Sequence, residues 1–382
     1  MHELEQHLAR LVAHDTTSRR SNLALIADVE AHLDAHGVAH QRVPSPDGTR
    51  AGLIARIGPP VEGGVVLSAH TDCVPVEGQP WSQDPFRLQR DGDRLTGRGT
   101  TDMKGFLATV LAAVPAMVRA ELARPVLLAL SYDEEVGTLG APDLVAALLA
   151  TQPRPAAVLV GEPTELRVVT AHKGVRVITT QVEGRDGHSS QPQRAANAVA
   201  AAAHLAVAID ELARAHREAA IDPRFDPPYT TFNLAMVEGG QAINIVPRSC
   251  TLRWEYRPVP ADDSEAILEQ VRHLAEQQIV PALRADTGTG GVRFRVEAVA
   301  RALTADDGPA EPLARRISGD SQPAGTVPFG TDGGHFQAAG LSTVVWGPGS
   351  IAQAHQPDEW IARSQLEACA AGLERLIDDL RR

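Results

Sequence analysis

Histidines and acidic residues stand at the ends of several short apolar segments. The segment SAHTD places His70 and Asp72 two residues apart, so both side chains point the same way if strand geometry persists. A metal-binding histidine commonly donates its second ring N–H to a carboxylate, which fixes its tautomer. The pair therefore predicts a metal ligand and the residue that orients it, although most such tripeptides bind no metal.

Two further segments place acids beside predicted elements. GRGTTDMKG puts Asp102 in a glycine-rich loop directly before a helical pattern, where a helix N-cap is the alternative interpretation. SYDEEVGTLGA ends a wholly apolar segment on Asp133, Glu134 and Glu135. Three adjacent acids repel one another unless a positive charge neutralises them. The sequence therefore indicates either a cation site or a solvated acidic turn.

The same pattern recurs twice more along the chain. VGEPTE ends an apolar segment on Glu162, and GPGSIAQAHQPDEW places His355 in a loop rich in glycine and proline. Active sites of open α/β sheets lie at the carboxyl ends of strands, so we expect these side chains to converge. Two histidines and three carboxylates suit two divalent ions of the zinc type with one carboxylate bridging, which leaves a further carboxylate free to act as a base.

Apolar segments alternate with helical patterns through the first 160 residues. Continuous apolar strands between helices indicate a sheet covered on both faces, hence an α/β sandwich. Ser21 is the expected N-cap of the second helix, and Pro115 is expected to interrupt or bend the third. The predicted helices are residues 3–14, 22–37, 105–118 and 141–150, and the predicted strands are 64–68, 125–131 and 156–160.

The pattern changes near residue 174. Strands are predicted at 175–183, 231–237, 250–257 and 292–299, with helices at about 195–214 and 263–284. This β-α-β-β-α-β order describes a two-layer unit that can bury its own sheet face. The remaining elements are a helix at 310–317, a strand at 342–346 and a helix from about 364. We therefore expect one domain, 175–300, to be inserted into another formed by 1–174 and 301–382.

Length and composition exclude several classes of protein. The chain has 382 residues, which at about 150 residues per domain is roughly two and a half domains. Lys and Arg number 36 against 48 Asp and Glu, and this net charge of −12 disfavours nucleic acid and anionic membranes as partners. No apolar run predicts a membrane span or a signal peptide. The three widely spaced cysteines fit a reducing compartment, so a cytoplasmic protein is expected.

The quoted motifs occur in the order found in one known protein family. SAHTDCVP, GRGTTDMKG, DEEVGTLGA, GEPTE and HQPDE resemble the dinuclear-zinc amidohydrolase and exopeptidase family, which includes aminoacylases, glutamate carboxypeptidases, succinyl-diaminopimelate desuccinylases and acetylornithine deacetylases. The resemblance covers nearly the whole chain. Segments 171–174, 187–198 and 347–360 are most similar to the acetylornithine deacetylases. The resemblance to the family implies a zinc-exopeptidase-like catalytic domain with an inserted lid and dimerisation domain.

The resemblance also implies roles for individual residues. The implied ligands of two divalent ions, zinc or less often cobalt, are His70 and Glu162 on one, Glu135 and His355 on the other, and Asp102 bridging both. Asp72 would orient the histidine before it, and Glu134 would be the general acid/base. The family often has a cis peptide bond after the bridging acid, here Asp102–Met103. The implied reaction is hydrolysis of the amide bond of an N-acyl amino acid.

The inserted domain is expected to supply contacts to a small-molecule substrate. In the family, residues corresponding to His188 reach across a homodimer to the oxyanion, and those corresponding to Asn244 and Arg257 grip the substrate carboxylate. A surface-loop histidine and an ion-paired strand arginine are the alternative interpretations. N-acetylornithine, with arginine biosynthesis as its pathway, is the substrate that the resemblance favours. HKGVR stands where a desuccinylase is expected to carry an arginine-rich entry, and this favours a short acyl group.

Other members of the family's substrate range stay open. Another N-acyl-amino-acid deacylase, a succinyl-diaminopimelate desuccinylase and a carboxypeptidase are the alternatives. The segment GTDGGHF, residues 330–336, departs from the deacetylase pattern and affects the expected acyl or amino-acid preference. A catalytically dead binding scaffold is disfavoured because every implied ligand is present. Lys104, Lys173, His14, His172 and His335 receive no role, and Cys73 is expected to pack as a small apolar residue.

Overall fold

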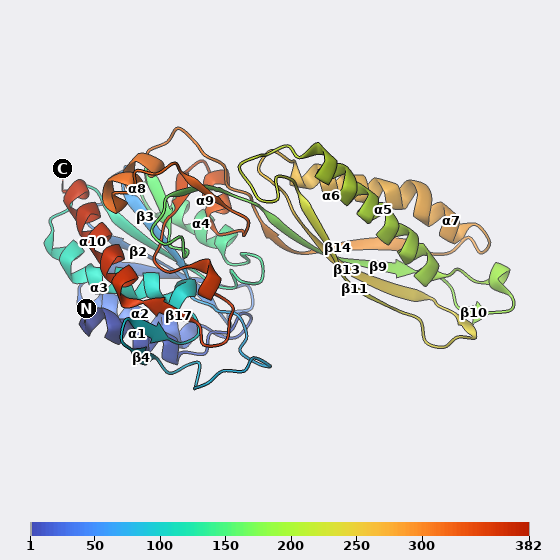
Figure 1. Ribbon diagram of the computed structural model, residues 1–382, viewed down its shortest axis with the longest axis horizontal. Helices are drawn as coiled ribbons and strands as arrows, with labels where there is room; N and C mark the ends of the chain where they lie inside the picture. The colour runs from blue at the N-terminus through green and yellow to red at the C-terminus, as the bar shows by residue number, and fades with distance from the viewer. Residues whose placement is uncertain (1, 382) are drawn as a thin grey trace. The chain divides into compact units, whose positions relative to one another are not determined.

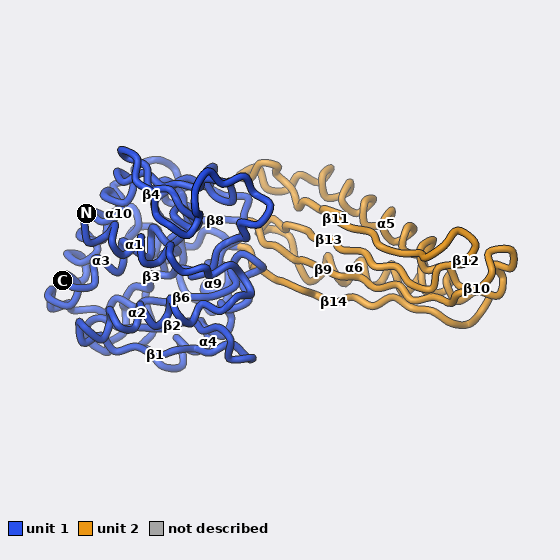
Figure 2. Tube along the Cα trace, turned by 90° about the horizontal axis from the view of Figure 1, so that it is seen from below, with its two compact units in different colours: residues 1–172, 303–382 blue, residues 173–302 orange. Residues whose placement is uncertain are grey.

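The computed structural model describes residues 2–381. The chain forms two compact units: unit 1 comprises residues 1–172 and 303–382, and unit 2 comprises residues 173–302 (Figure 2). Unit 2 is therefore an insertion between two stretches of unit 1, and each unit has a hydrophobic core of its own.

Unit 1 is built on a mixed sheet flanked by helices (Figure 1). The sheet has eight strands in the order β1-β2-β6-β3-β7-β16-β8-β15. Its strands are β1 (Ala39–Pro44), β2 (Ala51–Ile57), β3 (Val65–His70), β6 (Val126–Ser131), β7 (Ala157–Val160), β8 (Val169–His172), β15 (Gly325–Val327) and β16 (Ser342–Val345). A smaller sheet contains β4 (Gln89–Asp91), β5 (Arg94–Thr96) and β17 (Trp360–Ala362).

Helices cover both faces of the large sheet. One face packs on α1 (His2–Ala13), α2 (Leu23–Ala35), α3 (Gly105–Arg119), α8 (Ala310–Ser318) and α10 (Arg363–Leu380), and the other on α4 (Ala141–Thr151) and α9 (Gly333–Ala338). In β6, Val126, Leu128 and Leu130 enter the first core, whereas Leu127 and Ala129 enter the second. Side chains alternate across a strand, so burial on both faces explains why this strand is apolar from Val126 to Leu130.

Unit 2 contains a four-stranded antiparallel sheet in the order β11-β13-β9-β14. Its elements are β9 (Val175–Glu183), α5 (Ala198–Ala219), β11 (Thr231–Gly239), β13 (Ser249–Arg257), α6 (Ser264–Leu274), η3 (Ala275–Ile279), α7 (Val280–Arg284) and β14 (Gly291–Ala300), with a ribbon of β10 (Gly187–His188) and β12 (Ile245–Val246). The helices pack on one sheet face, where Trp254 donates from Nε1 to Thr180 Oγ1 at 2.9 Å.

The predicted elements of both units are found, but one cap prediction is wrong. Asn22, not Ser21, is the N-cap of α2, and its side chain makes no cap hydrogen bond. Asn22 is buried and its amide exchanges two hydrogen bonds with the backbone of Ala51, so tertiary contacts to β2 occupy it. The sequence patterns also miss several elements: β1, β2, β8 and β15 of the large sheet, the small sheet of β4, β5 and β17, the ribbon of β10 and β12, and helix α9. Pro115 does not interrupt its helix, because α3 is continuous through it.

A long apolar helical stretch belongs to the core of unit 1. Thr100–Arg119 is long and apolar enough to cross a membrane by length and composition, but 72% of its apolar 18-residue stretch is buried inside the fold. It contains the short turn η1 (Thr100–Lys104) followed by α3, and both pack within unit 1. A core helix of a large sheet protein has the same composition as a membrane span.

Candidate metal centre

Four adjacent strands of the large sheet end at one edge with a histidine or an acid close by. β6, β3, β7 and β16 are neighbours, and each pair among them is parallel. His70 is the last residue of β3, Glu162 lies two residues beyond β7, and His355 lies in the loop after β16. Glu134 and Glu135 follow β6. The parallel register therefore brings residues from distant parts of the sequence to one place.

Asp102 enters the same site from the turn η1 that precedes α3. Gly99 begins this turn with φ at 78°, in the left-handed region that favours glycine. A cis peptide bond joins Asp102 to Met103, as the resemblance implies. On the other side of the site, Gly161 packs against Phe106 of α3 so closely that a Cβ atom would lie 2.0 Å from the ring. Glycine at this position therefore lets the loop carrying the next residue, Glu162, approach α3.

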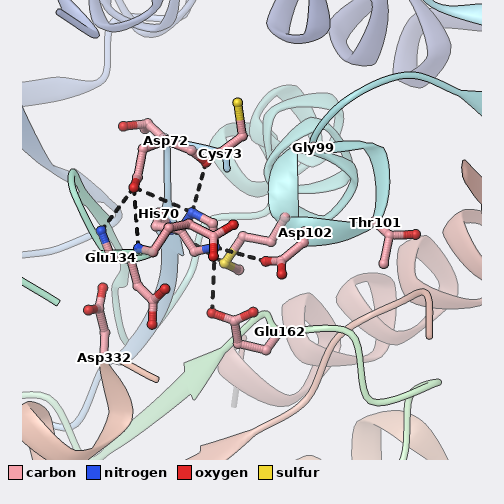
Figure 3. Close-up of polar contacts among 12 residues, drawn as sticks. His70, Asp72, Cys73, Gly99, Thr101, Asp102, Glu134, Glu162 and Asp332 are labelled. Carbon is pink, nitrogen blue, oxygen red and sulfur yellow. Dashed lines mark hydrogen bonds and ion pairs between the residues drawn. The ribbon is translucent and has the colours of Figure 1, made fainter. Parts of the chain in front are cut away.

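The five predicted ligands form two groups that share Asp102. In the first, His70 Nε2 lies 3.0 Å from Asp102 Oδ1 and 3.7 Å from Glu162 Oε1 (Figure 3). In the second, His355 Nε2 lies 2.9 Å from Glu135 Oε2 and 3.4 Å from Asp102 Oδ2. The ligand atoms of each group lie within 4.8 Å of one another. The two oxygens of one carboxylate thus face different histidines, which is the geometry of a bridge.

The cluster holds more negative charge than its histidines balance. Burial raises the pKa of Glu134 and of Glu162 well above the ordinary range, and neighbouring carboxylates raise both further. Burial, with Asp102 close by, also raises the pKa of Glu135 to about 7. Hydrogen bonds to Asp102 and Glu135 raise the pKa of His355 to about 10. Crowded carboxylates resist ionisation unless a cation neutralises them.

The donor set fits two divalent metal ions. Three carboxylates and two imidazoles are the ligand types that zinc accepts, and three protein ligands per ion leave positions open for water and substrate. Glu135 Oε1 is buried and has no hydrogen-bond partner within the described part of the chain, so one ligand oxygen is left without a proton donor. A buried polar atom of this kind is stabilised by coordination to a cation.

Asp72 holds several parts of the site together. Its carboxylate accepts from Glu134 N at 3.1 Å, Glu135 N at 3.3 Å and Ser18 Oγ at 2.7 Å. The ring of His70 makes its Nδ1 hydrogen bond to the backbone oxygen of Asp72 at 3.0 Å, and the carboxylate lies 3.5 Å away. The orienting contact thus comes from both the backbone and the side chain of one residue.

Glu134 and Asp332 face each other beside the first group (Figure 3). Glu134 supplies no atom to either group of ligands. Asp332 Oδ2 accepts from Ser131 Oγ at 2.5 Å, whereas Oδ1 is buried without a hydrogen-bond partner in the part of the chain described. Burial raises the pKa of Asp332 to about 6. No local sequence pattern marks Asp332, although its segment GTDGGHF departs from the deacetylase pattern.

The three predicted substrate contacts belong to unit 2. His188 is exposed on β10, where its Nδ1 lies 2.7 Å from Ser190 Oγ. Asn244 is exposed in the turn before β12. Arg257, at the end of β13, donates from Nε to Glu255 Oε1 at 3.1 Å. Their substrate roles remain predictions.

Several residues without an assigned role have partners in the structure. Lys104 is fully buried and donates from Nζ to His14 O at 2.9 Å. Lys173 is also buried and donates to the backbone oxygens of Pro227 and Tyr229. The remaining pairs are His14 with Asp28, His172 with Thr331, and His335 with Thr138. Cys73 is a buried free thiol, as expected.

The chain belongs to Peptidase family M20/M25/M40, which its residues 66–379 match. It is 35% identical to an acetylornithine deacetylase of Myxococcus xanthus, covering 98% of this chain and 96% of that protein. It is 32% identical to an acetylornithine deacetylase of Proteus mirabilis, covering 96% and 92%. The family assignment from motifs is therefore confirmed.

Solved structures show the same fold at low identity. A metallo-carboxypeptidase of the M20 family from Sulfolobus solfataricus superposes with a TM-score of 0.74 at 18% identity, covering 100% of this chain and 99% of that one. A dinuclear metal-binding M20 peptidase from Bacillus subtilis superposes with a TM-score of 0.66 at 16% identity, covering 99% and 97%. These likenesses confirm the predicted α/β fold class.

Proposed function

We propose that this protein hydrolyses the amide bond of N-acyl amino acids with two divalent metal ions, and that N-acetylornithine is its substrate. The observation that carries this proposal is the pair of ligand groups sharing Asp102 at the ends of adjacent parallel strands. Full-length similarity to acetylornithine deacetylases supports the substrate. Arginine biosynthesis in the cytoplasm is the role that this substrate implies.

The ligand set assigns a site to each ion. His70 and Glu162 would hold one, Glu135 and His355 the other, and Asp102 both. When bound, ions of the zinc or cobalt type supply Lewis-acid polarisation of the amide carbonyl and lower the pKa of an attacking water. The protein's part is to fix these side chains, and the parallel strand ends, the turn η1 and the loop after β16 bring them together.

Glu134 is the proposed general acid/base. It lies beside the first group of ligands (Figure 3), contributes to neither group, and is fixed through its backbone N–H to Asp72. Its carboxylate takes the proton of the attacking water and passes it to the nitrogen of the leaving amine. Without that transfer the amine would depart as a strongly basic anion, so proton delivery is needed for the C–N bond to break.

Unit 2 is the proposed lid and dimerisation domain. His188 would donate to the oxyanion of a neighbouring subunit, and Asn244 and Arg257 would bind the substrate carboxylate. Support for a homodimer comes from β11, an edge strand on which Met236 is 43% and Val237 60% exposed. An edge strand with unpaired backbone groups and exposed apolar side chains favours pairing with a second copy.

A substrate panel tests the proposal. Protein loaded with zinc or cobalt is assayed with N-acetylornithine, N-acetylcitrulline, N-acetylmethionine and N-succinyl-diaminopimelate. We expect kcat/KM to be highest for N-acetylornithine. A higher value for another acetylated amino acid or for the succinyl compound would replace the substrate and keep the chemistry, whereas no amide hydrolysis by metal-loaded protein would refute the chemistry.

A further inference from the structure

We propose that Glu359 is a positioning residue that holds the Asp102 turn in its bridging pose and, through Arg98, ties that turn to the loop carrying His355. This inference rests on the proposed function, because it concerns the assembly of the same metal centre. Glu359 supplies no atom to either group of candidate ligands. Its effect on the centre would therefore be indirect.

The carboxylate of Glu359 is surrounded by backbone donors of a single turn. Oε1 accepts from Thr101 N at 2.9 Å and Asp102 N at 3.1 Å, while Oε2 accepts from Gly99 N at 2.9 Å. Glu359 is 1% exposed, so water does not compete for these bonds. A carboxylate is the side chain that accepts several N–H bonds at once and donates none. The turn and its metal-facing aspartate are thereby fixed from behind.

Arg98 extends this contact to the second histidine. It is fully buried, and Nη1 donates to Glu359 Oε2 at 2.9 Å and to Gln356 O at 3.3 Å. Nη2 donates to the side-chain oxygen of Gln79. Gln79 Nε2 in turn donates to His355 O at 2.9 Å. A continuous hydrogen-bonded path therefore connects the backbone at Asp102 with the backbone at His355.

The position of Asp102 explains why this network matters for both ions. One oxygen of Asp102 faces His70 and the other faces His355, so a shift of the turn displaces a ligand from each group. Loss of Glu162 or Glu135, in contrast, removes a ligand from one group only. Residues that orient metal ligands typically change metal affinity about ten- to hundredfold when substituted.

The test is the substitution Glu359→Gln, with Glu5→Gln as a matched control. The amide keeps the shape of the side chain but turns one acceptor into a donor facing N–H groups. Glu5 is also a buried glutamate paired with arginines, Arg90 at 3.1 Å and Arg363 at 2.8 Å, but it accepts no hydrogen bond from a ligand-bearing turn. Zinc affinity of each protein is measured by competition with a chelator, together with the Tm of the apoprotein.

We expect Glu359→Gln to weaken zinc at both sites about ten- to hundredfold, and Glu5→Gln to leave both affinities unchanged. Wild-type affinities in Glu359→Gln, or equal losses in the two variants, would overturn the proposal. A wild-type protein that binds no zinc would instead refute the proposed function. If Glu359→Gln does not fold, Gln79→Met replaces it, because Gln79 lies in a partly exposed loop. About tenfold weaker zinc binding at the His355 site alone would support the hydrogen-bonded path. Unchanged zinc binding would overturn it.

Discussion

Substituting each of the adjacent acids Glu134 and Glu135 separates proton transfer from metal binding. Glu135 Oε2 lies 2.9 Å from His355 Nε2 within one ligand group, whereas Glu134 belongs to neither group. Glu134→Ala should therefore keep both ions and lose about 10²- to 10⁴-fold in kcat, the range for one acid/base group. That loss corresponds to about 3 to 5 kcal/mol in the activation barrier. Glu135→Ala should lose the ion on the His355 side.

The assay combines metal content with turnover. Each purified variant is loaded with zinc, freed of excess metal and analysed for ions per chain, and kcat is measured with N-acetylornithine. Glu134→Ala protein without metal would show that its carboxylate is a ligand, and the roles of the two neighbours would have to be exchanged. Fully loaded Glu135→Ala protein would refute its place in the second group. Glu5→Gln controls for loss of a buried carboxylate elsewhere in unit 1.

Three further predictions concern stability and assembly. Burial lowers the pKa of His7 to about 4, below its value of 6.5 in the unfolded chain. Between these two pH values the unfolded state binds more protons than the folded state. The free energy of unfolding therefore falls as the pH drops from 6.5 to 4. The test compares the free energies of unfolding of wild type and His7→Leu, both measured with a chelator present to remove bound metal. The difference between the two proteins should change by about 3 kcal/mol against wild type from pH 7 to pH 4. A difference that does not depend on pH would refute the lowered pKa of His7. Asn197 caps α5 by accepting from Ala200 N at 3.0 Å, so Asn197→Ala should destabilise unit 2 by about 1 kcal/mol in urea unfolding, while an unchanged midpoint would show that the cap contributes nothing. Equal mixing of inactive His188→Ala and Glu134→Ala proteins should restore about a quarter of wild-type activity, because half the dimers are mixed and each mixed dimer holds one intact site of two. No recovery after verified subunit exchange would place His188 in its own subunit's site or outside catalysis.

Four of the five ligands could be predicted from the sequence because each stands close to a recognisable element, whereas His355 lies in a loop and depended on the motif resemblance. The apolar segments before Glu134 and Glu162 form strands buried on both faces, and such segments are readable from composition alone. The edge strands were missed for the opposite reason. β1 (AHQRVP) has only exposed and half-buried residues with three polar side chains in its middle, and β15 is a half-buried strand of three residues, so neither has the apolar run that marks a central strand.

The pairing of residues across the sheet was outside the reach of sequence patterns. Which strands lie next to each other determines which acids meet, and the order β6-β3-β7-β16 joins segments more than 200 residues apart. Asp332 illustrates the difficulty: it precedes the six-residue helix α9, and only the tertiary fold places it beside Glu134. The motif resemblance supplied the roles that local patterns could not.

The order of the elements also accounts for a glutamate so close to the last ligand in sequence. After β16 the chain must place His355 at the sheet edge and then enter β17, which pairs with β5 just before the Asp102 turn. Glu359 is the residue directly before β17, so the pairing of β17 with β5 brings its carboxylate beneath the backbone of that turn. One short segment thus supplies a ligand to the second group and an anchor for the aspartate shared by both. Because the ligand and the anchor are only four residues apart, a displacement of this segment would disturb the two groups together. In Glu359→Gln the two sites should therefore lose metal together, in contrast to the one-sided loss expected for Glu135→Ala.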